Sequence, residues 1–131
     1  MRKEDFKKDI ETGDFLEYIE HQGNYYGTNW KSIKEVKDKG KICLIDLDLK
    51  GAKKIFEKKT NFKYLYLLPS SLEELREHLH ALNKEDVEVI EKRVNNTKNE
   101  LEKLSEINFF DKKMSYKSFP ETYHELKMWL Q

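Results

Sequence analysis

Apolar and polar side chains alternate over residues 15–20, and this pattern predicts a half-buried β-strand with Glu17 on its polar face. A turn marked by Gly23 and Gly27 follows this strand. We therefore expect a short hairpin, in which the glycines supply the turn and polar side chains gather on one side.

Further along the chain, apolar residues recur every three or four positions, which predicts amphipathic helices. These segments are residues 3–12, 29–39, 51–59, 72–82, 85–104 and 119–130. Gly13 and Gly40 follow the first two segments and provide C-terminal stops. Helix starts are expected at Asn29, at Ser70 or Ser71, and at Pro120. Inward positions on the last helix are Tyr123, Leu126 and Leu130, and a last short strand is expected at residues 109–110.

Two nearly continuous apolar runs, residues 41–49 and 62–68, are typical of strands that are buried on both faces. With the helix over residues 51–59 between them, they predict a right-handed crossover that joins parallel strands. Asp46 and Asp48 lie two residues apart at the end of the first run, and so on the same face of the strand. The carboxyl end of such a strand is where a binding site opens.

The predicted hairpin carries a carboxylate on Glu17, a phenol on Tyr26 and a hydroxyl on Thr28. The carboxylate can accept two hydrogen bonds, the phenol can donate one to a phosphate oxygen, and the hydroxyl can donate one to a carbonyl. Guanine presents the complementary groups, since its N1–H and exocyclic amine are adjacent donors and its O6 is an acceptor. Adenine lacks the N1 donor and has the opposite polarity at position 6.

These residues resemble the GMP-binding segment of guanylate kinases. The similar stretches are Phe-Leu-Glu at 15–17, Gly-Asn-Tyr-Tyr-Gly-Thr at 23–28 and Asp-Leu-Asp-Leu-Lys-Gly at 46–51. The resemblance implies that Glu17 reads the guanine base and that Thr28 helps to read it. It further implies that Tyr26 holds the phosphate and that Asp48 contacts the nucleotide.

The resemblance continues through residues 68–75 and 90–94, and it becomes weaker after about residue 76. It implies an α/β fold of the P-loop-kinase type, with helices around a parallel sheet that lacks the P-loop strand, and a small GMP-binding β subdomain. Residues 1–131 are expected to form a single domain of this kind. Its GMP-binding subdomain would cover 1–40, and its remaining core 41–131, with a degenerate lid at about 76–90.

Transfer of a phosphoryl group from ATP requires a loop of backbone N–H groups with a lysine and a metal ion, typically Gly-x-x-x-x-Gly-Lys-Ser/Thr. The five glycines of this chain do not form that pattern. In guanylate kinases this loop, and arginines that grip the GMP phosphate, precede the region matched here, so we expect them to be missing. Loss of two such arginines lowers the affinity for GMP by about a hundred- to ten-thousand-fold.

The lid departs from the family pattern as well. Guanylate kinases place an arginine before a leucine and then Arg-Gly-Thr, whereas residues 78–84 read His-Leu-His-Ala-Leu-Asn-Lys. Only Arg93 keeps its place as a catalytic arginine. The Asn-Asp-Asp-Leu element that helps to hold adenine is replaced at residues 110–114. The family uses ATP and Mg²⁺, but this chain is expected to bind neither by itself, except that Asp46 can reach a magnesium ion through water.

Two functions stay open. The first is a guanylate-kinase-like protein, from the family that phosphorylates GMP to GDP with ATP. This chain would be a truncated or degenerate form that is inactive alone, or it would work with a second chain that supplies the P-loop strand. That strand would lie between the predicted strands at residues 41–49 and 62–68. Without it, these two strands would pair with each other directly, or their unpaired edges would leave the fold poorly stable. The second function is a pseudoenzyme, a non-catalytic module that binds a protein ligand through its GMP subdomain.

Composition excludes other partners. Lys plus Arg and Asp plus Glu number 25 each, so no net field favours nucleic acid or an anionic membrane. Cys43 is alone, which excludes a disulfide within the chain and predicts a buried structural thiol in a reducing compartment. No apolar run approaches the roughly 18 residues of a membrane span, and the start is charged from Arg2, so we expect a cytoplasmic protein. The four histidines are scattered, and no zinc site is expected.

Overall fold

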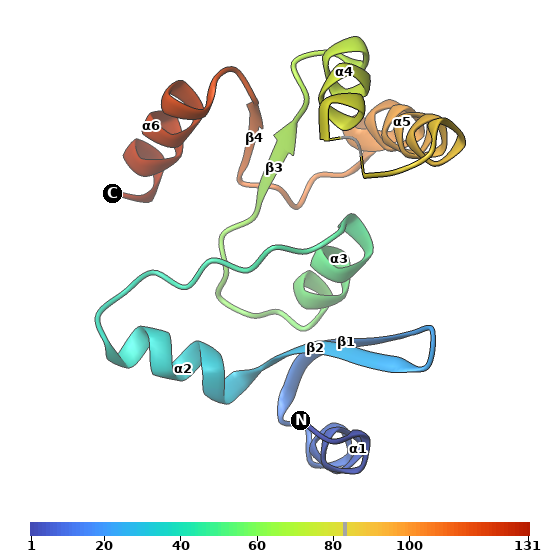
Figure 1. Ribbon diagram of the computed structural model, residues 1–131. Helices are drawn as coiled ribbons and strands as arrows, with labels where there is room; N and C mark the ends of the chain where they lie inside the picture. Colours follow the sequence, from blue (N-terminus) through green and yellow to red (C-terminus); the bar gives the residue numbers. More distant parts are fainter. Residues whose placement is uncertain (83) are drawn as a thin grey trace. The chain divides into compact units, whose positions relative to one another are not determined.

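The computed structural model describes residues 1–82 and 84–131, and it divides into two compact units, residues 1–62 and residues 63–131 (Figure 1). Each unit contains its own two-stranded sheet together with helices. The expected single domain, with a boundary at residue 40, stays a prediction. Asn83, which belongs to the degenerate lid stretch, lies outside the described residues.

The first unit is built on an antiparallel hairpin. Its elements in order are α1 (Lys3–Thr12), β1 (Phe15–His21), β2 (Asn24–Asn29), α2 (Trp30–Asp38) and α3 (Leu49–Glu57). Gln22 and Gly23 form the tight turn, both with positive φ (50° and 75°), as a two-residue hairpin loop requires. Gly13 ends α1 in the left-handed conformation, and the Asn29 side chain caps α2 by accepting a hydrogen bond from the Lys31 N–H at 2.7 Å.

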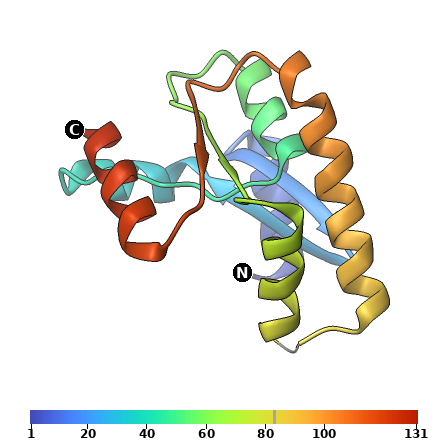
Figure 2. The same cartoon turned by 90° about the horizontal axis from the view of Figure 1, so that it is seen from above.

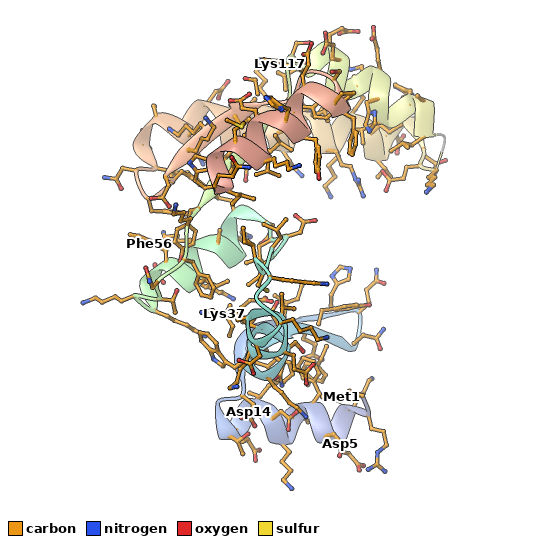
Figure 3. The ribbon with its side chains drawn as sticks, turned by 90° about the vertical axis from the view of Figure 1, so that its left-hand side faces the viewer. Met1, Asp5, Asp14, Lys37, Phe56 and Lys117 are labelled. Carbon is orange, nitrogen blue, oxygen red and sulfur yellow. The ribbon has the colours of Figure 1, made fainter. Side chains whose placement is uncertain are left out.

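Aromatic packing attaches α1 to the hairpin. The buried ring of Phe6 stacks on Phe15 with 4.2 Å between the ring centroids and on Tyr25 with 5.3 Å. Asp5 lies on the side of α1 away from the hairpin, where it pairs with Arg2 at 2.9 Å (Figure 3). The amphipathic pattern of residues 3–12 therefore predicted the helix, and Phe6 lies on the face that it buries.

The predicted strand over residues 41–49 is wrong. The segment is extended, but within the described residues it belongs to neither sheet, and α3 already begins at Leu49. Its side chains still alternate: Cys43 is half-buried, whereas Ile42 and Leu44 are 60% and 67% exposed. Hydrogen bonds to a neighbour make a strand, and apolar composition alone does not supply them. Consequently the predicted crossover and the direct pairing with residues 62–68 are not formed, and Cys43 is not a fully buried thiol.

The second unit contains a parallel strand pair. Its elements in order are β3 (Leu65–Leu68), α4 (Leu72–Leu82), α5 (Val87–Lys103), a 3₁₀ turn (Leu104–Glu106), β4 (Lys112–Ser115) and α6 (Phe119–Leu130). β3 and β4 run side by side with Leu65 opposite Lys112, and α4 lies beside α5 (Figures 1 and 2). Ile90, Val94, Leu104 and Met114 are buried in this unit.

Helix termini in the second unit follow the expected chemistry. The Ser71 hydroxyl accepts a hydrogen bond from the Glu74 N–H at 3.0 Å at the start of α4, and the Ser118 hydroxyl accepts one from the Glu121 N–H at 3.4 Å at the start of α6. Tyr123 is 55% exposed rather than inward. Thr122 is the buried residue of α6, and its hydroxyl accepts a hydrogen bond from the Lys117 N–H at 3.0 Å.

The predicted strand at residues 109–110 is also wrong, because the strand begins at Lys112. The two phenylalanines instead make edge-on ring contacts, Phe109 with Tyr64 at 5.5 Å and Phe110 with Tyr66 at 5.2 Å between centroids. An aromatic pair has strand propensity, but here its packing partners decide its conformation.

Arg76 links the two helices of the second unit. Its Nε lies 2.7 Å from a Glu91 oxygen on α5, and its Nη1 lies 2.8 Å from Glu73 on α4. The hydrogen bond from this guanidinium lowers the pKa of Glu91, and the same bond raises the pKa of Arg76. The pair therefore ties together the two helices that span the expected lid region, residues 76–90.

Candidate functional site

The centre of the candidate site is Glu17. The side chain is only 9% exposed, and its Oε1 accepts a hydrogen bond from Thr28 Oγ1 at 2.7 Å across the hairpin. Within the described residues, no buried side-chain oxygen or nitrogen lacks a hydrogen-bond partner. The second carboxylate oxygen, to which none of these residues donates, therefore reaches the surface and is free to accept a hydrogen bond from a ligand.

The alternation of side chains predicted that Glu17 lies on an exposed polar face. A β-bulge explains why it is buried instead. Phe15 lies opposite Asn29 and Glu17 lies opposite Thr28, so Leu16 is the extra residue on β1. Leu16 is completely buried, next to the buried Glu17. Regular alternation would place these neighbours on opposite faces. Past the bulge, Glu17 lies directly opposite Thr28, so the two side chains share one face of the hairpin.

Tyr26 lies on the same face of the hairpin as this pair. It is opposite Ile19, two residues along each strand from Thr28 and Glu17, and residues two apart on a strand point to one face. Its ring is 54% exposed, and its hydroxyl makes no hydrogen bond with a described residue. The hairpin therefore brings together the three groups that the sequence predicted to converge, although Tyr26 is not bonded to the other two.

Gly27 plays a part that sequence reasoning missed. It is not in the turn but within β2, opposite Tyr18. A Cβ at this position would lie 2.6 Å from the Glu17 carbonyl oxygen and 3.0 Å from the Tyr18 Cβ. The absence of a side chain lets β2 approach the backbone of Glu17 closely.

Asp48 is the N-cap of α3, and its Oδ1 accepts a hydrogen bond from the Gly51 N–H at 2.8 Å. One oxygen thus stabilises the helix, and the other is available. Asp46 is exposed in the preceding extended segment. Within the described residues, no group of three or more His, Cys, Asp or Glu side chains is placed to hold a metal ion. The contact of Asp46 with a magnesium ion through water stays a prediction, because Mg²⁺ keeps several waters and needs only one or two protein carboxylates.

Arg93 lies on α5 in the second unit and is 57% exposed along its side chain. Its Nη2 is 2.7 Å from Glu85 Oε1. The guanidinium is thus engaged in an ion pair at the surface, where a ligand would have to compete with Glu85.

The comparisons with known proteins bear on the whole chain. The family model described as guanylate kinase matches residues 1–131. The chain belongs to the guanylate kinase family. This confirms the resemblance found in the hairpin and the Asp48 segment.

Comparison with individual guanylate kinases shows how much of their length this chain covers. The chain is 36% identical over 109 residues to the guanylate kinase of Clostridium perfringens, covering 83% of this chain and 50% of that protein. It is 35% identical over 129 residues to the guanylate kinase of Sus scrofa, covering 97% of this chain and 64% of that protein. The chain therefore spans about half to two thirds of the length of these relatives.

A solved structure confirms the fold. The guanylate kinase of Anaplasma phagocytophilum matches with a TM-score of 0.68 at 24% sequence identity, covering 99% of this chain and 61% of that one. The guanylate-kinase-like α/β fold predicted from the sequence is thus confirmed. Across the described part of the chain, none of the helices is both long and apolar enough to cross a bilayer.

Proposed function

We propose that this guanylate-kinase family member binds GMP and reads its guanine base with Glu17. The single observation that carries this proposal is the buried Glu17 carboxylate, held by Thr28 at one oxygen and open at the other. The N1–H and exocyclic amine of guanine are adjacent donors that a carboxylate can accept together. A buried, oriented carboxylate recognises such donors more strongly than an exposed one, because less water competes.

The role that we propose for Thr28 differs from the donation to a carbonyl that the sequence suggested. Its hydroxyl has one proton, and that proton is donated to Glu17. In this arrangement Thr28 cannot also donate to guanine O6. Its role in the proposal is to orient the carboxylate, and its oxygen can accept a hydrogen bond from a donor on the base.

Tyr26 and Asp48 complete the proposed site. The exposed Tyr26 phenol lies on the Glu17 face of the hairpin and can donate to a phosphate oxygen. The Asp48 oxygen that does not cap α3 can accept from a nucleotide hydroxyl. Arg93 belongs to the proposal only as a candidate catalytic arginine, since its guanidinium is paired with Glu85.

Phosphorylation of GMP by ATP is the reaction that family membership suggests, and we propose that this chain alone is a degenerate form that does not catalyse it. No Gly-x-x-x-x-Gly-Lys-Ser/Thr pattern occurs in the sequence to cradle the phosphates of ATP and position Mg²⁺. A second chain that supplies a P-loop strand is part of this proposal. Its support is the extended segment over 41–48, where Ile42 and Leu44 are exposed. The cytoplasmic location stays a prediction.

Calorimetric titration tests the proposal. We expect saturable binding of GMP and no detectable binding of AMP. Glu17→Gln should weaken GMP binding by roughly ten- to a hundredfold, because a charge-assisted acceptor is lost. Glu20→Gln, on the exposed part of the same strand, is the matched control and should bind like the wild type. Absence of GMP binding by the folded wild-type protein would refute the proposal. GMP-dependent ADP formation by this chain alone would refute its catalytic half.

A non-catalytic module that binds a protein ligand is the second candidate. The observation in its favour is apolar exposure on the hairpin itself, where Tyr18 and Ile19 are 44% and 49% exposed. A folded protein that ignores GMP, and that loses binding to a peptide ligand on Ile19→Ser, would favour this alternative.

A further inference from the structure

We infer that Lys58 is a positioning residue for the guanine site, because it holds the β1 bulge that directs Glu17 toward Thr28. This inference rests on the proposed recognition of guanine by Glu17. Its structural half, the link from Lys58 to the Glu17 side chain, is testable without any nucleotide.

The contact that carries the inference joins α3 to β1. Lys58 is the residue directly after the last turn of α3, and its Nζ donates a hydrogen bond to the carbonyl oxygen of Leu16. Leu16 is the extra residue of the bulge, directly before Glu17. The ammonium group therefore binds the backbone at the point where the ladder between β1 and β2 is irregular.

The bulge matters because it sets the direction of the carboxylate. A shift of one residue turns a side chain to the opposite face of a strand. Leu16 and Glu17 are both buried, and the irregular register lies between Phe15 and Glu17, where Leu16 is the extra residue. Bulges of this kind re-aim side chains next to functional sites. A group that fixes the bulge thereby fixes the place where Glu17 meets Thr28.

The peptide on the other side of Glu17 is also tightly held. A Cβ on Gly27 would lie 2.6 Å from the Glu17 carbonyl oxygen, so β2 packs directly against it. The backbone around Glu17 is thus bound by Lys58 before the residue and enclosed by Gly27 after it. Helix α3 also presents Asp48 at its start and Lys58 at its end, and it packs against β1. One helix therefore supports both carboxylates of the proposed site.

Three variants separate positioning from simple stabilisation. Lys58→Met keeps the unbranched stem but removes the donor, and Lys58→Arg restores a cationic donor. Lys54→Met is the matched control, since Lys54 is exposed one turn earlier on α3 and bonds to no described residue. Circular dichroism establishes that each variant is folded, and Lys58→Ala replaces Lys58→Met if the latter does not fold.

The first readout is carbon-13 NMR of the free protein. We expect the Leu16 carbonyl and the Glu17 carboxyl resonances to shift together in Lys58→Met, to return toward their wild-type positions in Lys58→Arg, and to stay unchanged in Lys54→Met. An unchanged Glu17 resonance in Lys58→Met overturns the inference.

The second readout is the affinity for GMP divided by the affinity for IMP. Inosine lacks the exocyclic amine from which the carboxylate accepts a hydrogen bond. This ratio should fall roughly tenfold in Lys58→Met, which corresponds to one misdirected hydrogen bond. It should recover in Lys58→Arg and stay unchanged in Lys54→Met. An equal loss of affinity for both nucleotides means that Lys58 only stabilises the fold, and this also overturns the inference. If the wild-type protein binds neither nucleotide, the proposed function fails. The NMR result alone then decides whether Lys58 positions the Glu17 side chain.

Discussion

Thr28 Oγ1 donates a hydrogen bond to Glu17 Oε1 at 2.7 Å, from one strand of the hairpin to the other. The contact joins residues 11 positions apart in the sequence and involves Glu17, a residue that is 9% exposed. A buried carboxylate without this donor would lose an interaction that water can only partly replace. The bond is therefore both a structural tie of the hairpin and the device that orients the candidate base-reading group.

Replacement of Thr28 by valine keeps the shape of the side chain and removes the donor. We expect the free energy of unfolding to fall by about 1 to 3 kcal/mol, because Glu17 stays buried with one acceptor unsatisfied. Denaturant unfolding measures this change. A double-mutant cycle with Glu17→Ala should show that the two losses are not additive. A coupling energy near zero would contradict the role assigned to the pair.

Gly27→Ala should destabilise the protein, since the added Cβ meets the Glu17 carbonyl oxygen at 2.6 Å and the backbone must move. A loss of about 1 to 3 kcal/mol is typical of overpacking. Gly40→Asn is the control: nothing lies within 4 Å of a Cβ there, and asparagine tolerates its φ of 69°. Thermal unfolding should separate the two variants. Equal melting temperatures would show that the hairpin yields without strain at Gly27.

Asp48→Ala removes the N-cap of α3. The expected loss is about 1 kcal/mol of stability, the usual value for such a cap. Asp48→Ser keeps a capping oxygen and should retain most of the stability, while it removes the carboxylate proposed to contact the nucleotide. Asp46→Ala is the matched control in the extended segment. If Asp48→Ser unfolds as readily as Asp48→Ala, the charge rather than the cap is what matters at this position.

Tyr66 gives a prediction at high pH. Its hydroxyl donates to Glu100 Oε2 at 2.6 Å, and burial, together with this bond and the negative charge of Glu100, raises the pKa of the phenol well above its usual range. In the unfolded chain the phenol ionises near its ordinary pKa of about 10. The folded state binds more protons above that pH, so the contribution of Tyr66 is complete below about pH 10 and is lost as the pH rises toward the folded pKa.

Tyr66→Phe should therefore lose stability at neutral pH and show a smaller further loss above about pH 10 than the wild type. Denaturant unfolding at several pH values between 7 and 11 measures the difference, where these values bracket the ordinary pKa of about 10. Tyr123→Phe, on the exposed face of α6, should follow the wild type at every pH. Parallel pH profiles for Tyr66→Phe and the wild type would exclude the assigned pairing.

Local signals in the sequence were sufficient for most elements. Apolar periodicity predicted the helices, and Gly13, Asn29 and Ser71 mark three of their boundaries through interactions within a few residues. The hairpin and the family resemblance were also readable, because the residues that carry them lie within 15–28 and 46–51. The hairpin that carries Glu17 and Thr28 followed from strand alternation and a short turn.

Contacts between distant residues decided the rest. Residues 41–48 have the composition of a buried strand, but a strand forms only where a neighbour accepts and donates its backbone hydrogen bonds, and no such neighbour lies in the described sheets. The bulge at Leu16, the close approach of Gly27 and the hydrogen bond from Lys58 likewise depend on which surfaces meet after folding. By itself, the sequence determined the family, the helices and the candidate residues for reading guanine. Only the tertiary structure decided that Glu17 is buried and where its free oxygen lies, since burial is a property of packing rather than of local pattern.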